Sequence, residues 1–470
     1  YMRKLTFALF FANRGFFPAE SIGRAREEME KAVTDLGFEY IEMESTLTRF
    51  GAVETQEEGF RYANFLKEHE GGYDGVIMCL PNFGDENGAL KAMHDCRTPI
   101  LLQAYPDEAG AMDFSHRRDA FCGKISIADT FRQAGIRFTV FPPHTCRPDS
   151  EAFRTQLATF AQVCAIVRKM RDFNIGAFGA RTTAFKTVRY DELALQTNDI
   201  NCETIDMYQI CRRMKAVDLN SEEFKKACEK VINACDTCDM PDGTIEAQAA
   251  LYITLKNLFQ EYHLDAAAIR CWPDLQDEFR ITPCLVMGLL HEEHMPVACE
   301  MDVCNGVAMA ILNAASELPP ICMDWNNNYA EDPEQCILFH CGSVPESQLM
   351  EKGRVVSHKM LDKGREELGG VAWGCKQVRV KPGVMTYMSA KTENGKLTFY
   401  LGKGEIQDTE VEKEFFGCPA VIRIPQLQRL LMNICKKGYR HHVSMVRGDV
   451  EDAVREAITT YLGYEIDEMF

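Results

Sequence analysis

Short apolar runs alternate with amphipathic segments over the first 325 residues, and this alternation limits the fold more than any other feature of the chain. In the amphipathic segments, apolar residues recur at helical spacing, as at residues 20–36 and 56–68. The apolar runs between them have the length and composition of buried strands, at residues 5–11, 38–42, 73–80 and 100–104. Strands that alternate with helices in this way predict a parallel sheet covered by helices on both faces.

The alternation restarts after a long predicted helix at residues 148–173, and its further predicted strands are residues 174–178, 266–270, 296–299 and 320–323. Beyond about residue 324 the pattern changes to short β-like segments, and Asn394-Gly395 is a strong hairpin signal between two of them. We therefore predict two Rossmann-like α/β domains, residues 1–168 and 169–325. A β-rich, barrel-like domain follows at residues 326–470 and ends with a helix near residues 450–462.

The net charge and the cysteine pattern indicate which partners the protein can bind and which cellular compartment it occupies. The formal net charge of −18 repels nucleic-acid phosphates and anionic lipid, so we expect neither a nucleic-acid nor a membrane partner. No apolar run approaches the roughly 20 residues that a membrane helix needs. The 20 cysteines are scattered through apolar runs without the regular framework of a secreted domain, which predicts reduced thiols and a cytoplasmic protein.

Two short motifs suggest zinc, and their spacing argues against it. Cys235 and Cys238 form a CxxC pair, but no second pair follows at zinc-site spacing. His291 and His294 flank two glutamates, but the second histidine falls one place early for a zinc protease helix. The chain also lacks a glycine-rich phosphate loop, which removes most support for nucleotide binding.

The stronger pattern is a pair of acids at the ends of two predicted strands. Glu300 follows the strand at 296–299, and Asp324 follows the strand at 320–323. The helix predicted between them should return the chain so that the two strands lie side by side or nearly so, with both carboxylates within reach of one cation. Ligands bind at the carboxyl ends of such strands. Carboxylates suit Mn²⁺ or Mg²⁺, and an imidazole favours Mn²⁺; the His441-His442 pair is the best candidate to supply it.

These residues carry a family resemblance. The segments Ala298-Cys299-Glu300-Met301-Asp302, Met323-Asp324-Trp325 and His441-His442-Val443-Ser444-Met445-Val446-Arg447-Gly448 resemble the ligand set of the L-fucose/L-arabinose isomerase family. The interval from Glu300 to Asp324 is 24 residues (324 − 300) and is closer to the fucose isomerase branch. Members of this family have two α/β domains and a β-rich domain, so the resemblance covers essentially the whole chain.

The resemblance implies a metal site of Glu300, Asp324 and His442 that holds Mn²⁺ or another divalent cation. Glu300 and Asp324 would also be the catalytic carboxylates, with base and acid unassigned, and the role of His441 stays open. Arg14, Trp325 and His340 are assigned to substrate binding. For each there is an alternative: a surface cation for Arg14, a core aromatic for Trp325, and for His340 either an extra metal ligand, as in the arabinose branch, or a role behind the ligands.

The implied function is a metal-dependent aldose–ketose isomerase, an intramolecular oxidoreductase. Its substrate would be a small free sugar, a deoxyhexose or pentose similar to L-fucose or D-arabinose, converted through an enediolate. The implied assembly is a homo-oligomer, a trimer or hexamer, to which the N-terminal domain contributes substrate and oligomer contacts. Two alternatives stay open: another metal-dependent carbohydrate enzyme, such as an epimerase or aldolase, and a non-catalytic sugar-binding protein.

Overall fold

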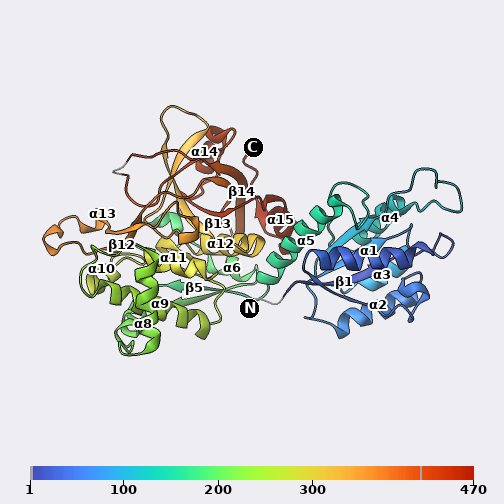
Figure 1. The fold of residues 1–470 in the computed structure, drawn as a ribbon, viewed down its shortest axis with the longest axis horizontal. Coiled ribbons are helices and arrows are strands. Elements are labelled where there is room, and N and C mark those ends of the chain that lie inside the picture. The colour runs from blue at the N-terminus through green and yellow to red at the C-terminus, as the bar shows by residue number, and fades with distance from the viewer. Residues whose placement is uncertain (1–3, 413–414) are drawn as a thin grey trace. The chain divides into compact units, whose positions relative to one another are not determined.

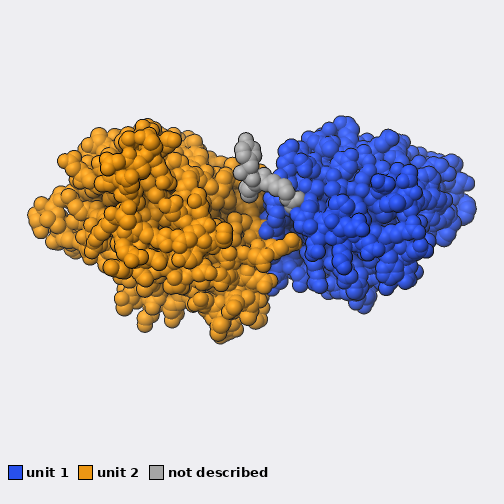
Figure 2. All heavy atoms as spheres, turned by 90° about the horizontal axis from the view of Figure 1, so that it is seen from below, with its two compact units in different colours: residues 1–168, 452–463 blue, residues 169–451, 464–470 orange. Residues whose placement is uncertain are grey.

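A computed structural model describes residues 4–412 and 415–470 of the chain. The chain forms two compact units (Figure 2). Unit 1 contains residues 1–168 and 452–463, and unit 2 contains residues 169–451 and 464–470. The borders of the three domains expected from the sequence, 1–168, 169–325 and 326–470, stay predictions.

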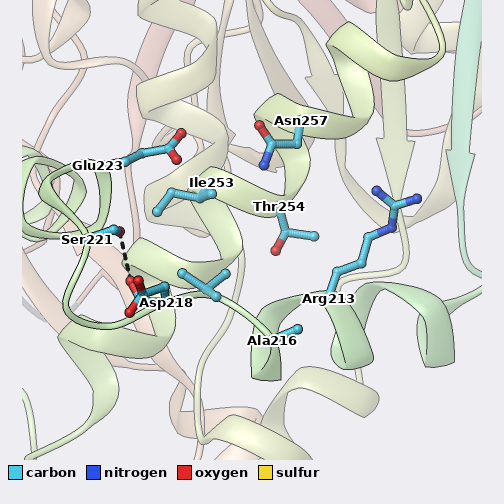
Figure 3. A pocket seen from close by; sticks show the side chains of 9 residues that line it. Arg213, Ala216, Asp218, Ser221, Glu223, Ile253, Thr254 and Asn257 are labelled. Atoms are coloured by element: carbon cyan, nitrogen blue, oxygen red, sulfur yellow. Dashed lines mark hydrogen bonds between the residues drawn. The ribbon is translucent and has the colours of Figure 1, made fainter.

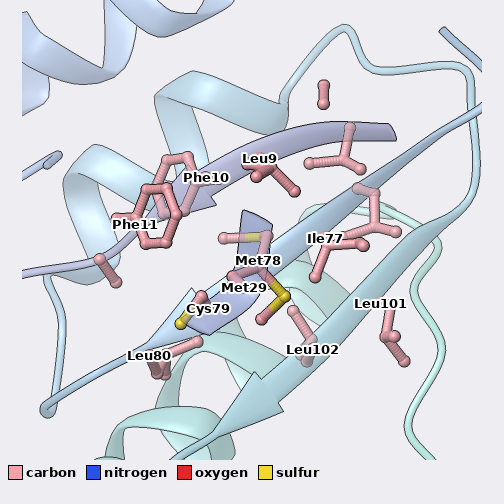
Figure 4. Close-up of a cluster of buried hydrophobic side chains, with 14 of the residues drawn as sticks. Leu9, Phe10, Phe11, Met29, Ile77, Met78, Cys79, Leu80, Leu101 and Leu102 are labelled. Atoms are coloured by element: carbon pink, nitrogen blue, oxygen red, sulfur yellow. The ribbon is translucent and has the colours of Figure 1, made fainter. Parts of the chain in front are cut away.

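Unit 1 is built on a four-stranded parallel sheet in the order β2-β1-β3-β4. Figure 1 labels its strand β1 and the helices α1 to α5. Every residue of β1, β3 and β4 is buried, as expected for parallel strands covered on both faces. Figure 4 shows Leu9 and Phe10 of β1 beside Ile77 and Met78 of β3 in this core. The strands are β1 (Thr6–Phe11), β2 (Glu39–Glu42), β3 (Gly75–Leu80) and β4 (Ile100–Ala104), and the helices are α1 (Ser21–Asp35), α2 (Gln56–Glu68), α3 (Glu86–Met93), α4 (Ala120–Gln133) and α5 (Glu151–Lys169).

Unit 2 begins with a second parallel sheet, in the order β6-β5-β7-β8. Its strands are β5 (Phe173–Phe178), β6 (Ile200–Ile205), β7 (Ala266–Ile269) and the two-residue edge strand β8 (Val297–Ala298). The helices of this part are α6 (Glu192–Gln196), α7 (Met207–Lys215), α8 (Glu222–Ala234), α9 (Thr244–Glu261), α10 (Asp274–Phe279), α11 (Cys284–Glu292) and α12 (Val303–Ser316). Both predicted α/β sheets are therefore present.

Unit 2 also contains a closed β-barrel. Its strand order is β13-β16-β9-β10-β15-β14, and β13 pairs with β14 to close the ring. The strands are β9 (Ile321–Asn328), β10 (Gln335–Phe339), β13 (Gly383–Glu393), β14 (Lys396–Ile406), β15 (Ala420–Arg423) and β16 (His442–Arg447). Asn394 and Gly395, both with positive φ, turn the predicted hairpin between β13 and β14. The predicted fold class, parallel α/β sheets followed by a barrel-like domain, is confirmed.

Smaller elements complete the chain. β17 (Glu465–Ile466) pairs with β14, and β11 (Arg354–Ser357) pairs with β12 (Trp373–Gln377). The short helices are α13 (Lys359–Asp362), α14 (Leu427–Lys436) and α15 (Glu451–Glu456), the last continued by a π-helical turn at Ala457–Leu462. In the described part of the chain, no helix combines the length and the hydropathy needed to cross a membrane.

The prediction that strands 296–299 and 320–323 lie side by side is wrong. The first contributes β8 to the parallel sheet, whereas the second becomes β9 of the barrel. The physical reason is the pairing available to β9, whose eight residues run antiparallel between β16 and β10. The partner strand β16 lies more than 100 residues later in the chain, so a local pattern does not reveal it.

Helix α12 joins the sheet to the barrel, because it packs on β5, β7 and β8 and also on β13 and β16. Gly306 allows the close approach to the sheet: a Cβ there would lie 2.8 Å from Ile175 Cδ1 and 3.0 Å from the Ala267 carbonyl oxygen. Asn305 contacts the barrel, because its side-chain oxygen accepts a hydrogen bond from Ser444 Oγ at 2.9 Å. The turn that precedes α12 is therefore held between the two sheets of unit 2.

Candidate active site

Glu300 lies in the turn between β8 and α12. Glu300 and Met301 have φ angles of 57° and 65°, in the left-handed region that non-glycine residues rarely adopt. Asp302 ends the turn as the N-cap of α12, and its carboxylate accepts a hydrogen bond from the Asn305 N–H at 3.2 Å. Strained backbone of this kind is concentrated at functional sites, and here it directs the Glu300 carboxylate towards the barrel, where it meets His442.

Asp324 and His442 come from neighbouring antiparallel strands of the barrel. They form a direct cross-strand pair in the register of β9 and β16, so their side chains share one face of the barrel wall. Ser444, two residues after His442 and therefore on the same face, contacts α12 through Asn305. The pairing register thus points Asp324 and His442 to the side of the barrel that α12 covers.

Two of the residues predicted as metal ligands, Glu300 and Asp324, each approach the third, His442. His442 Nε2 lies 2.9 Å from Glu300 Oε2 and 3.6 Å from Asp324 Oδ1. The His442 side chain is fully buried, while Glu300 and Asp324 keep 20% and 19% of their side-chain surface exposed. The site is therefore anchored in the protein interior and open on the carboxylate side.

Sequence reasoning missed Asp302 and Arg440. Asp302 Oδ2 accepts a hydrogen bond from His442 Nδ1 at 2.8 Å, and its other oxygen binds the buried Arg440 guanidinium. A carboxylate behind a metal-binding histidine commonly fixes the ring tautomer in this way, leaving the opposite nitrogen free to bind the ion. The available signal was the position of Asp302, two residues after Glu300 and directly before a predicted helix.

The electrostatics of the site follow from this crowding of acids. Burial raises the pKa of Asp324 to about 7; His442 opposes the rise, and Glu300 and Asp302 add to it. For Glu300, burial acts in the same direction, but the hydrogen bond from His442 holds the pKa below its usual value. Burial opposes protonation of His442, yet hydrogen bonds to Asp302 and Glu300 raise its pKa well above normal. These carboxylates thus favour the positively charged form of His442.

The donor set fits a divalent cation. Asp324 Oδ1 is buried and has no hydrogen-bond partner in the part of the chain that the structure describes. Among the described residues, ligand atoms of Glu300, His441 and His442 lie within 4.8 Å of one another, and so do those of Asp324, His340 and His442. Buried carboxylate oxygens need a compensating positive charge, and a mixed carboxylate and imidazole set suits Mn²⁺ or a similar ion.

His340 and His441 also lie at this site. His441 Nε2 is 3.9 Å from Asp324 Oδ1, and the His340 ring centroid is 6.0 Å from that of His442. Burial lowers the pKa of His340 to about 3 and that of His441 to about 4, so both rings are neutral near pH 7. Phe185, in the loop after β5, contacts His441 edge to face with ring centroids 5.5 Å apart and covers this side of the site.

Trp325 and Arg14 have other contacts. Trp325 is paired in register with Leu338 of the barrel core, so it faces away from Asp324, and its indole N–H donates to Tyr400 Oη at 2.9 Å. Arg14 lies in unit 1, where its guanidinium binds Glu86 and the Gly84 carbonyl oxygen and stacks on Phe83. The substrate-binding roles of both residues stay predictions.

A cavity of about 380 Å³ lies at one end of the barrel and reaches the site through His441. Trp325 and several side-chain amides line this cavity. The positively charged lining residue is Arg440, which forms an ion pair with Asp302. The amides are those of Asn326, Asn327, Asn328, Gln335 and Gln428. A second cavity of about 340 Å³ lies between α7, α8 and α9, lined by Arg213, Thr254 and Asn257 among others (Figure 3), and contains none of the predicted site residues.

Comparison with protein families identifies the family of the chain. The model of the fucose/sulfoquinovose isomerase N-terminal domain matches residues 8–171, and that of the L-fucose isomerase C-terminal domain matches residues 338–470. Together they span more than half of the chain and place it among the sugar isomerases. The chain belongs to the L-fucose isomerase family, so the predicted family and the predicted enzyme class, an aldose–ketose isomerase, are confirmed.

Several curated relatives are named sulfoquinovose isomerase. The protein from Alkalicoccus urumqiensis is 25% identical over 398 residues, which cover 83% of this chain and 85% of that one. The protein from Priestia aryabhattai is 22% identical over 389 residues, 82% and 83% of the two chains. The protein from Clostridium sp. (strain MSTE9) is 23% identical over 349 residues, 72% and 73% of the two chains.

Replacing Asp302 with Ala is expected to lower the free energy of unfolding of unit 2 by about 3–5 kcal/mol, because Arg440 is left buried without its partner. Adding Arg440→Met should recover part of this loss, so the double variant is more stable than the sum of the two single effects implies. Urea unfolding followed by tryptophan fluorescence measures this, since Trp272, Trp325 and Trp373 all lie in unit 2.

The matched control is Asp449→Ala, which removes a solvent-exposed ion pair with Lys403 and should change the free energy by about 0–1 kcal/mol. Strictly additive effects of Asp302→Ala and Arg440→Met would contradict the proposed coupling.

Proposed function

We propose that this chain is a divalent-cation-dependent isomerase that interconverts an open-chain aldose and its ketose. The observation that carries the proposal is the convergence of Glu300, Asp324 and His442 from a strand-to-helix turn and two barrel strands. Membership of the L-fucose isomerase family supports the reaction class. Glu300, Asp324 and His442 would hold the cation, for which Mn²⁺ is the first candidate.

The reaction moves a proton between C1 and C2 of the sugar while the carbonyl group moves the other way. A divalent cation, when bound, supplies Lewis-acid stabilisation of the negative charge that develops on the two sugar oxygens of the enediolate. Glu300 and Asp324 are the carboxylates within reach, and one of them takes the proton from one carbon and returns it to the next. Asp302 and Arg440 keep His442 oriented while this occurs.

The surroundings of the carboxylates favour a dry and ordered site. His442, Asp302 and Arg440 are buried, and Phe185 covers the two adjacent histidines from the loop after β5. Excluding water strengthens the electrostatic interactions in the site and protects a reactive intermediate. These residues therefore hold the proposed ligands in place and shield the site, whereas the proton transfer itself belongs to Glu300 or Asp324.

We propose sulfoquinovose, a hexose that carries a sulfonate, as the first substrate to test. The support is the name shared by the relatives, which align with 72–83% of this chain. A neutral sugar similar to L-fucose or D-arabinose is the second candidate, and the cavity beside His441 favours it. That cavity is lined by amides and Trp325. The positively charged residue in its lining, Arg440, is already paired with Asp302 and so offers no free charge to a sulfonate.

We also propose a cytoplasmic homo-oligomer, a trimer or hexamer, for this enzyme. All 20 cysteines are free thiols, which fits a reducing compartment. The family resemblance supports the oligomer, in which Arg14 would contribute to substrate binding. Light scattering on the purified chain is expected to give a mass three or six times 53.3 kDa, and a monomer would contradict the proposed assembly.

Glu300→Gln is expected to lower kcat by about 10²–10⁴-fold, because the amide cannot exchange a proton with the sugar. The fold should persist, since Gln has nearly the same shape and His442 remains bound to Asp302. The measurement is ketose formation from an aldose with Mn²⁺ present, together with a fluorescence unfolding curve.

The control is Glu317→Gln, an exposed residue at the other end of α12, which should retain full activity. A Glu300→Gln enzyme with near-normal turnover would remove Glu300 from the mechanism.

Among the candidate sugars, we expect sulfoquinovose to give a kcat/KM at least about tenfold above that of L-fucose, a ratio that about 1.4 kcal/mol of additional interaction produces. The assay is run in D₂O with Mn²⁺, and proton transfer should place deuterium on C1 of the ketose.

The other outcomes identify the alternatives. Faster turnover of L-fucose or D-arabinose supports the neutral substrate instead. Cleavage fragments would indicate an aldolase, an aldose labelled at C2 an epimerase, and no conversion of any sugar a binding protein.

A further inference from the structure

We infer that His340 acts as a hydrogen-bond donor to a hydroxyl group of the sugar and is not a ligand of the cation. The inference rests on the proposed function, because it assigns a role to one residue of the same site. It concerns the ring tautomer of His340, which its backbone environment determines.

The Cys341 backbone N–H donates a hydrogen bond to His340 Nδ1 at 2.8 Å. A backbone amide can only donate, so Nδ1 must carry a lone pair and no proton. The ring is then the neutral tautomer with its proton on Nε2, since the doubly protonated ring has no acceptor nitrogen. A nitrogen that carries a proton has no lone pair for a metal ion, so Nε2 is a donor.

This donor has no hydrogen-bond partner in residues 4–412 and 415–470. His340 is only 3% exposed, and its Nε2 is buried without a hydrogen bond among the described residues. A buried N–H without an acceptor is costly, and such groups in native structures usually mark the position of a ligand or an ordered water. His340 therefore presents an unused donor at a site where a polar ligand is expected.

An unused acceptor lies close by. A ring nitrogen of His340 is within 4.8 Å of an Asp324 carboxylate oxygen and of a ring nitrogen of His442. Asp324 Oδ1 is itself buried and accepts no hydrogen bond from the described residues, although His442 Nε2 lies 3.6 Å away. A hydroxyl group accepts one hydrogen bond and donates another, so it can bridge His340 Nε2–H and Asp324 Oδ1. A carboxylate oxygen has two lone pairs, so this acceptor role is compatible with cation binding.

The bridge predicts selectivity. A sugar with a hydroxyl at this position satisfies both buried groups, whereas the corresponding deoxy sugar leaves both of them unpaired. Sites built to hydrogen-bond a hydroxyl discriminate strongly against analogues that lack it. His340 would thus contribute to substrate orientation and selectivity, while Glu300, Asp324 and His442 hold the ion.

The first test compares Mn²⁺ binding to His340→Leu and to His442→Gln by electron paramagnetic resonance of the full-length protein. His340→Leu should bind Mn²⁺ with the stoichiometry of the wild type and a Kd within about threefold. His442→Gln, which alters a proposed ligand, should lose at least tenfold in affinity. Loss of Mn²⁺ from His340→Leu to the same extent as from His442→Gln would show that His340 is a ligand and overturn the inference.

The second test measures substrate binding in the same variants. The alditol of the best substrate has the sugar hydroxyls without the carbonyl, so its affinity in calorimetry reports hydroxyl recognition without turnover. His340→Leu should weaken alditol binding by about tenfold or more and raise KM more than it lowers kcat. His340→Gln, whose amide nitrogen lies near the position of Nε2, should recover part of the affinity. Unchanged alditol binding in His340→Leu would overturn the inference and leave water as the bridging group.

The third test reads the tautomer directly. In a long-range ¹H–¹⁵N spectrum of histidine-labelled protein, the signals absent from His340→Gln should have the shifts of a neutral ring protonated at Nε2. Protonation at Nδ1 would overturn the inference. This measurement needs no substrate, so it separates the two proposals: if the wild type converts no sugar, the proposed function fails while the tautomer is still decided.

Discussion

A buried chain of charged groups holds the site together, and the rest of unit 2 is arranged around it. Arg440 binds Asp302, Asp302 accepts from His442 Nδ1, and His442 Nε2 contacts Glu300. Asp302 begins α12, whereas Arg440 and His442 lead into and begin β16, so this chain ties the parallel sheet to the barrel. A buried ion pair of this kind is costly to break and offers little gain over an apolar core. Its presence indicates a positional role, which here is to fix the orientation of His442.

The same arrangement explains the strained turn at Glu300 and Met301. Two consecutive left-handed residues cost free energy, and the packing of α12 between the sheet and the barrel supplies the constraint that maintains them. Gly306 allows α12 to pack closely on the sheet, and Asn305 bonds it to the barrel. The first turn of α12 therefore has little freedom to move. Because Glu300 lies in the turn that leads into α12, its carboxylate is positioned before any ligand arrives.

Local sequence was sufficient to propose Glu300, Asp324 and the His441-His442 pair, because an acid that follows a short apolar run and a pair of histidines beside one are visible in it. The choice of His442 within that pair came from the family resemblance. The sheet to which Asp324 belongs was not predictable in this way, since its partner His442 is 118 residues distant (442 − 324). Asp302 and Arg440 were missed for the same reason. Local sequence shows each of them as an ordinary charged residue, and only the fold shows that they form an ion pair across 138 residues. The fold class was predictable because apolar periodicity reports burial, whereas register and pairing depend on contacts that periodicity does not encode.

The central claim is that Glu300, Asp324 and His442 share one divalent cation. Diffraction from crystals grown with MnCl₂, collected on both sides of the manganese absorption edge, tests it most directly. The account predicts one strong anomalous peak in contact with an oxygen of Glu300, an oxygen of Asp324 and Nε2 of His442, with His442 Nδ1 still bound to Asp302. No peak between these three side chains, or manganese bound elsewhere in the molecule while the three remain unliganded, would contradict it.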